Sequence, residues 1–222
     1  MRAPEITCLF LDIGGVLLTD GWNRQQRQLA ITAFELDADE FERRHHQAAD
    51  TWEIGKMTMD DYLDQVVFHR KRTFDPRQFK DFMFAQSQPH LEMISLFSGL
   101  KKRYGMKIVA VSNEARELNL HRITTFQLND FIDFFVSSCV VHLRKPDTDI
   151  FKLALEGVHI APEHVLFIDN NPLFTEVAEG LGMRNIVHVD HESTCMQLES
   201  LGLWTDETGI EMAECGVGYG SH

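Results

Sequence analysis

The sequence has few cysteines and no long apolar runs. Its four cysteines, Cys8, Cys139, Cys195 and Cys215, include no CxxC pair, so we expect free thiols and a reducing, cytoplasmic location. No apolar run approaches the roughly 18 residues that a membrane-spanning helix needs. The opening residues Met1 to Glu5 lead directly into a short strand-like segment without the pattern of a signal peptide. We therefore expect no membrane partner.

Basic residues are also scarce relative to acidic ones. The 222 residues include 21 Lys and Arg against 34 Asp and Glu, a formal net charge of −13. This excess argues against non-specific binding to nucleic acid or to anionic lipid. A small phosphorylated substrate remains compatible with it, because a local cationic pocket can oppose the overall field. The length suits one or two compact domains.

Strand and helix patterns alternate over most of the chain. Such alternation predicts an α/β fold with a doubly wound, mostly parallel sheet covered by helices on both faces. Five segments have the apolar, β-branched character of buried strands: 6–11, 107–111, 134–137, 165–168 and 186–189.

The segment between the first two strands is different, because its periodicity is helical throughout. Helix starts are indicated at Asp37, Thr58 and Asp75, each a favoured N-cap residue. With a helix near residues 22–34, this gives about four helices. An insert at the carboxyl end of the first strand is placed to cover the crevice as a lid.

These patterns predict the domain organisation. Residues 1–19 and 88–204 form the core, and residues 20–87 form an all-helical cap. Residues 205–222 form a tail that is rich in glycine and poor in apolar side chains, for which we expect disorder.

Four polar residues stand where open α/β sheets place their chemistry. Asp12 ends the first apolar run and is followed by Gly14 and Gly15, which permit a sharp turn and close approach to a ligand. The other three are Ser112 after the second strand, Lys145 before a helix, and Asp169 after a later strand.

The order, spacing and context of these residues resemble the haloacid dehalogenase (HAD) superfamily. The motifs are LDIGGVLL, IVAVSNEA, LRKPDTDIFKLAL and VLFIDNNPLF. The resemblance extends to about Leu203, and the helical insert, with its turn at residues 52–55, is similar to the family's helical cap. It implies a five-stranded Rossmann-like core and hydrolase activity.

The resemblance also implies roles for the residues. Asp12 would be the nucleophile that forms an aspartyl-phosphate. Mg²⁺ would be held by Asp12, Asp169 and the backbone carbonyl of Gly14. Ser112 and the backbone N–H of Asn113 would bind phosphoryl oxygens, and Lys145 would neutralise developing charge.

Two asparagines follow the last motif residue. Relatives often carry a second acid and then Asn at positions 170 and 171. Asn170 is a candidate for a metal contact made through water or through another ligand. Asn171 is expected to be a turn residue leading to Pro172.

The sequence departs from most phosphatases of the family at Gly14. Those enzymes carry a second Asp there, which protonates the leaving group and then activates water. A DxG first motif also resembles a subgroup of sugar-1-phosphate phosphatases. Three interpretations stay open: leaving groups of low pKa need no acid; a cap residue such as His45, His46 or Glu53 supplies one; or the protein binds phosphate with poor turnover.

The predicted function is a Mg²⁺-dependent phosphatase acting on a small phosphorylated metabolite, such as a sugar phosphate. One alternative is a weakly active or non-catalytic, regulatory phosphate-binding protein. The other is a 2-haloacid dehalogenase, which would carry an aromatic residue in place of Gly14. The substrate and the oligomeric state stay open at this point.

Overall fold

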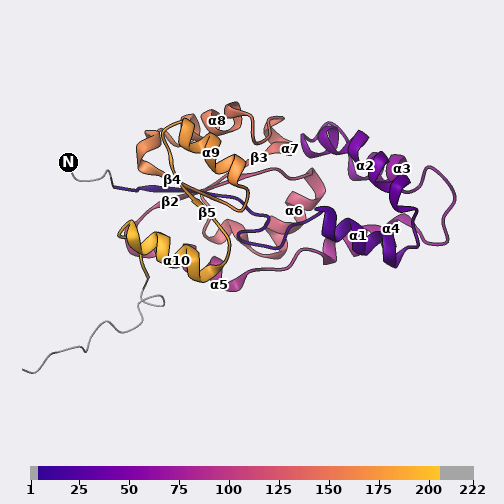
Figure 1. Cartoon of the computed structure of the whole chain (residues 1–222), viewed down its shortest axis with the longest axis horizontal. Coiled ribbons are helices and arrows are strands. Elements are labelled where there is room, and N and C mark those ends of the chain that lie inside the picture. Colours follow the sequence, from indigo (N-terminus) through magenta and orange to yellow (C-terminus); the bar gives the residue numbers. More distant parts are fainter. Residues whose placement is uncertain (1–4, 206–222) are drawn as a thin grey trace, which may run out of the picture.

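The computed structural model describes residues 5–205, and Figure 1 shows a sheet with helices on both faces and a helical lobe at one end. Of the predicted tail, only Thr205 belongs to this part, and the rest lies outside the described residues. None of the helices within residues 5–205 is long and apolar enough to cross a membrane.

The sheet has five parallel strands in the order β3-β2-β1-β4-β5. The predicted α/β class and the five-stranded parallel sheet are thus confirmed. β1 lies in the middle and pairs with both β2 and β4, so the carboxyl end of β1 lies between the carboxyl ends of these two strands. The bounds are β1 Cys8–Leu11, β2 Lys107–Ser112, β3 Phe134–Ser137, β4 Val165–Asp169 and β5 Arg184–Val187.

Helices cover both faces of the sheet because successive side chains of each strand point to opposite sides. Leu9 and Leu11 of β1 pack into one apolar cluster with α5 and α10, whereas Cys8 and Phe10 pack into another with α8 and α9. The core helices are α5 Leu91–Tyr104, α6 Arg116–Thr125, α8 Thr148–Val158, α9 Pro172–Gly180 and α10 His191–Ser200, and 3₁₀ turns η1 and η2 span Leu128–Asp130 and Pro162–His164.

Residues 20–87 contain four α-helices and no strand. Three of the helices begin at the predicted N-caps, because the side chains of Asp37, Thr58 and Asp75 accept backbone N–H groups of the first turn. Thr58 forms a reciprocal capping box with Asp61. The bounds are α1 Arg24–Ala33, α2 Ala38–Glu53, α3 Met59–Val66 and α4 Pro76–Ala85.

These four helices share an apolar cluster of their own. It includes Trp22, Tyr62 and Phe79, and it extends to Ala115 and Leu118 at the start of α6. The lobe therefore has an apolar core that continues into the start of α6, and it is an all-helical segment inserted between β1 and β2 (Figure 1).

A short helix, α7 (Ser138–Val141), follows β3 directly and was not predicted. Four residues are too few to show a helical period. The Ser138 hydroxyl donates to the backbone carbonyl of Glu53 at the end of α2 (2.7 Å). In the same place Gly55 has φ +71°, and a Cβ on it would lie 2.1 Å from the carbonyl oxygen of Cys139. The cap turn and α7 thus pack backbone against backbone.

Candidate active site

Asp12, Ser112 and Asp169 meet at the carboxyl edge of the sheet. Asp12 follows β1, Ser112 ends β2, and Asp169 ends β4. Because β1 pairs in parallel with both neighbours, the three side chains lie at one edge. All three are buried. The structure therefore brings together the three strand-end residues that the sequence singled out.

Lys145 reaches this group from the loop between α7 and α8. Its Nζ lies 2.5 Å from Oδ2 of Asp169 and 3.1 Å from Oδ1 of Asp12. The side chain is fully buried. One ammonium is thus shared by two carboxylates, which leaves the cluster with one negative charge in excess.

The protonation of this cluster follows from burial and from the charges. Burial lowers the pKa of Lys145, but the charges of Asp12 and Asp169 outweigh it and hold that pKa above its usual range. Burial and the charge of Asp12 raise the pKa of Asp169 to about 6, against the opposing effect of Lys145. Lys145 is therefore cationic, and Asp169 lacks full charge compensation from the protein.

Asn113 fixes the backbone of Lys145. Its amide Nδ2 donates to the Lys145 carbonyl, its Oδ1 accepts the Lys145 N–H, and both distances are 2.9 Å. The sequence predicted a role for the backbone N–H of Asn113 but not this one for its side chain. No local pattern indicated it, because 32 residues separate the two partners.

The donors predicted for Mg²⁺ fit a hard cation. Within residues 5–205, no cluster of three or more His, Cys, Asp and Glu side chains is placed to hold a metal. The set is two carboxylates, Asp12 and Asp169, with the backbone of Gly14 lining the same cavity as Asp12. Mg²⁺ is commonly bound by one or two carboxylates, substrate phosphate and water. The excess negative charge and the raised pKa of Asp169 both favour a bound cation.

The turns after β1 and β4 pack against each other. Gly15 has φ +74°, and a Cβ on it would lie 2.0 Å from Nδ2 of Asn170, so only glycine fits. Asn170 also lines the cavity. Asn171 caps α9 by accepting the Leu173 N–H (3.0 Å), and its own N–H donates to Oδ1 of Asp169 (2.8 Å). Asn171 is thus the predicted turn residue and also orients Asp169.

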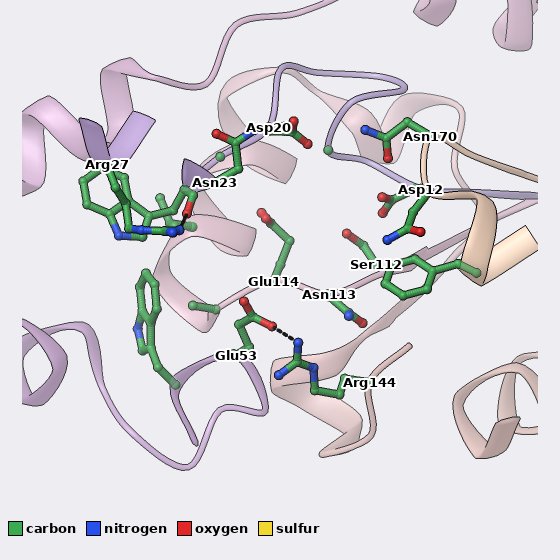
Figure 2. Close-up of a pocket in the computed structure, with 18 of the residues that line it drawn as sticks. Asp12, Asp20, Asn23, Arg27, Glu53, Ser112, Asn113, Glu114, Arg144 and Asn170 are labelled. Carbon is green, nitrogen blue, oxygen red and sulfur yellow. Dashed lines mark hydrogen bonds and ion pairs between the residues drawn. The ribbon is translucent and has the colours of Figure 1, made fainter. Parts of the chain in front are cut away.

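A cavity of about 510 Å³ lies between this edge of the sheet and the cap. Figure 2 shows the carboxylates of Asp12, Asp20 and Glu114 directed toward a common space within it. Both lobes supply the wall. The core contributes Asp12, Gly14, Ser112, Asn113, Glu114, Arg144 and Asn170, and the segment from 20 to 53 contributes Asp20, Trp22, Asn23, Arg27, His45, Trp52 and Glu53.

His45 is held neutral in the cap wall. The indole N–H of Trp22 donates to the hydroxyl oxygen of Tyr62 (2.9 Å), so the Tyr62 proton is directed to Nδ1 of His45 (2.9 Å). Burial, with the nearby Arg27 charge, lowers the pKa of His45 to about 3. The neutral ring therefore carries its proton on Nε2, and His45 cannot serve as a general acid near neutral pH.

The other two cap candidates differ in position. His46 lies on the exposed side of α2, with 72% of its side chain exposed, and is not part of the cavity wall. Glu53 lines the cavity and pairs with Arg144, whose Nη2 lies 3.1 Å from Oε2 of Glu53 (Figure 2). Burial raises the pKa of Glu53 despite Arg144.

Two residues that sequence reasoning missed form a buried ion pair beside the cavity. Nη1 of Arg122 lies 2.8 Å from Oε1 of Glu114, and the Arg122 side chain is fully buried. Nη2 of Arg122 donates to the backbone carbonyl of Thr19. Burial raises the pKa of Glu114, although Arg122 opposes this. The sequence did offer one indication that Glu114 lies near the site, because Glu114 follows Ser112 by only two residues.

The family model for haloacid dehalogenase-like hydrolases matches residues 6–173. This stretch is most of the chain, and the protein belongs to that family of hydrolases. A HAD family enzyme from Bacteroides thetaiotaomicron, crystallised with magnesium and inorganic phosphate, has a TM-score of 0.67 at 21% identity, over 83% of this chain and 94% of that one. This likeness shows the shared fold.

Two curated relatives match parts of the chain. The phosphorylated carbohydrates phosphatase of Thermotoga maritima is 31% identical over 83 residues, which are 37% of this chain and 38% of the relative. Bifunctional epoxide hydrolase 2 of Sus scrofa is 25% identical over 145 residues, 64% of this chain. The match spans only 25% of the length of the pig protein.

Proposed function

We propose that the chain is a Mg²⁺-dependent phosphatase that acts on a small phosphorylated metabolite through an aspartyl-phosphate on Asp12. The observation that carries this proposal is the buried cluster of Lys145 with Asp12 and Asp169, in which Asp12 lines the polar cavity between the sheet edge and the helical lobe. It supplies a carboxylate nucleophile, a fixed cation and two carboxylates for a metal ion. The phosphatase from Thermotoga maritima and the magnesium–phosphate complex of the Bacteroides enzyme support the same chemistry.

Each residue has a defined task in this proposal. A carboxylate oxygen of Asp12 attacks phosphorus, and the bond from phosphorus to the leaving oxygen breaks. Ser112 and the backbone N–H of Asn113 donate to phosphoryl oxygens, and Lys145 offsets the charge that accumulates on them. Asp12, Asp169 and the Gly14 carbonyl would hold Mg²⁺, which screens the repulsion between the anionic nucleophile and the anionic phosphate.

The substrate class follows from the wall of the cavity. A volume of about 510 Å³ suits a small molecule. Two charged side chains of the cap wall are paired, Arg27 with Glu42 and Glu53 with Arg144. A wall of aromatic and paired polar groups favours a neutral, hydroxylated organic part, and we propose a phosphorylated carbohydrate. The helical cap at residues 20–87 would close over it.

A panel of phosphorylated metabolites assayed with Mg²⁺ and with EDTA tests the function. We expect phosphate release with Mg²⁺, loss with EDTA and recovery on readdition. Asp12→Asn should abolish turnover and leave the fold intact, whereas Asp81→Asn, at an exposed position in α4, should not alter it. Full activity in EDTA would indicate carbon–halogen chemistry. Phosphate binding without turnover or labelling of Asp12 would indicate the regulatory alternative.

A further inference from the structure

The loss of an acid at position 14 leaves open which group activates the water that hydrolyses the phosphorylated enzyme. A Cβ built on Gly14 would lie 3.4 Å from Oδ1 of Asp20 and 3.5 Å from Nη1 of Arg122. Among residues 5–205, these two side chains are the nearest to that point. A carboxylate oxygen thus lies in contact with the point where a side chain at position 14 would begin.

We propose that Asp20 is the general base that activates water for hydrolysis of the phosphorylated Asp12. This proposal rests on the proposed phosphatase function. Asp20 lines the same cavity as Asp12, and Figure 2 shows both carboxylates directed into one space. Carboxylates are among the side chains that act as general bases.

The two oxygens of Asp20 have different surroundings. Nδ2 of Asn23 donates to Oδ2 of Asp20 at 2.6 Å. The other end of the Asn23 amide caps α1 by accepting the N–H groups of Gln25 (2.8 Å) and Gln26 (3.3 Å). The amide orientation is therefore fixed, and it holds one oxygen of Asp20. No hydrogen bond from residues 5–205 reaches Oδ1, which is the oxygen beside Gly14.

The charged groups around Asp20 are also held in place. Arg122 of α6 and Glu114 of the loop before α6 approach within 3.4 Å of a Cβ built on Gly21, the residue after Asp20. Figure 2 shows Glu114 and Asp12 directed into the same space as Asp20. The Arg122 guanidinium donates to the carbonyl of Thr19, the residue that precedes Asp20. Arg122 and Asn23 are thus positioning residues that fix the Asp20 backbone and side chain from two sides.

Other acidic or basic groups of the cavity are less suited to this task. Oε1 of Glu114 pairs with Arg122 at 2.8 Å, and although its Oε2 has no hydrogen-bond partner among the described residues, neither oxygen is among the atoms nearest to a Cβ at position 14. Glu53 pairs with Arg144 at 3.1 Å. Nδ1 of His45 is engaged in a hydrogen bond with the Tyr62 hydroxyl (2.9 Å). Asp20 is the group whose free carboxylate oxygen adjoins position 14.

The step balances without a further reactant. Asp20 accepts a proton from a water molecule while the water oxygen forms a bond to phosphorus. The bond between phosphorus and the Asp12 oxygen breaks, and its electron pair returns to the Asp12 carboxylate. The products are inorganic phosphate and free Asp12, and Asp20 then releases its proton to solvent.

Rapid-quench kinetics with p-nitrophenyl phosphate and Mg²⁺ on the full chain test this assignment. We expect Asp20→Asn to release about one p-nitrophenol per site at the wild-type rate, because its nucleophile is intact. Steady-state turnover should then fall by about 10²–10⁴-fold, and mass spectrometry should find the phosphoryl group on Asp12. Asp81→Asn is the matched control at an exposed position.

A second variant tests the positioning of the base. Asn23→Ser keeps an N-cap acceptor for α1 but cannot reach Asp20, so it should also show a burst and slowed turnover, with unchanged helix content by circular dichroism. Wild-type turnover in Asp20→Asn, or equal slowing of the burst and the steady state in both variants, would overturn the proposal. A wild type that neither releases p-nitrophenol nor becomes phosphorylated would instead refute the phosphatase function, and this assignment with it.

Discussion

Asn113 and Lys145 are joined by two hydrogen bonds of 2.9 Å, in which each residue both donates and accepts. The bonds connect the residue after β2 to the loop that carries the buried ammonium group. The position of that charge therefore depends on a side chain 32 residues away in sequence.

Replacing this asparagine should weaken both the fold and the site. Asn113→Ala leaves two backbone groups of Lys145 without their partner, and we expect the free energy of unfolding to fall by about 1–3 kcal/mol. Turnover should fall as well, because the ammonium is no longer held. Urea unfolding and phosphatase assays measure the two effects. Asn129→Ala, at an exposed position, is the control; equal effects of the two substitutions would contradict the prediction.

Removing the ammonium itself should have a larger effect. Lys145→Met leaves Asp12 and Asp169 buried side by side without their counter-charge, and we expect a loss of about 3–5 kcal/mol of stability. Chemical denaturation in EDTA measures it. Lys152→Met, which removes an exposed lysine paired with Asp149, should leave stability unchanged.

The stability of the protein should depend on pH through His45. Its pKa is about 3 in the folded protein, against about 6.5 for a histidine in the unfolded chain. Between these values the unfolded chain binds a proton that the folded chain does not, so stability is lost as the pH falls below about 6.5. The contribution approaches about 1.4 kcal/mol per pH unit. His45→Gln should flatten the dependence between pH 6.5 and 5, and the exposed His46→Gln should not.

A comparison of Gly15 with Gly105 distinguishes the cost of backbone strain from the cost of a steric clash when a side chain is added. Both have positive φ, +74° and +65°, but a Cβ would meet Asn170 only at Gly15 and nothing within 4 Å at Gly105. Gly15→Ala should therefore destabilise the protein more than Gly105→Ala, for which we expect the backbone strain alone, about 1–3 kcal/mol. Thermal unfolding of the two alanine variants measures this difference. Equal decreases in melting temperature would show that Asn170 moves away from the new side chain at no cost in stability.

The missing acid at position 14 should show in the choice of leaving group. No carboxyl group at that position can protonate the departing oxygen, so kcat/KM should be higher for aryl or anomeric sugar phosphates than for simple alkyl phosphates. Gly14→Asp, with metal binding verified, should raise the alkyl rate relative to the aryl rate. Equal kcat/KM values in the wild type, with chemistry rate-limiting, would show that another acid is already in place.

The sequence was sufficient to predict features that are encoded locally. Asp12, Ser112 and Asp169 each end a buried strand, and parallel strands bring such ends to one edge. The helix starts at Asp37 and Thr58 followed from capping side chains in the first turn.

Features that depend on tertiary approach were not predictable in this way. Asp20 lies beside Gly14 only because the chain turns back after β1, and Arg122 reaches the same place from a helix about 100 residues further on. His45 and His46 are adjacent in sequence, yet one is buried and the other exposed, because they occupy different faces of α2. The protonation state of His45 depends on its hydrogen bond with Tyr62 and on its burial, and neither can be predicted from the neighbouring sequence.

The two connections between the sheet domain and the cap run side by side. The backbone N–H of Thr19 donates to the carbonyl of Gln88 (2.8 Å), and its hydroxyl donates to the carbonyl of Gln86 (2.8 Å). An insert whose ends meet in this way can be exchanged for another of different size while the strands keep their order. The carboxyl edge of the sheet, where Asp12, Ser112 and Asp169 meet, is thus built independently of the length of the segment that covers it.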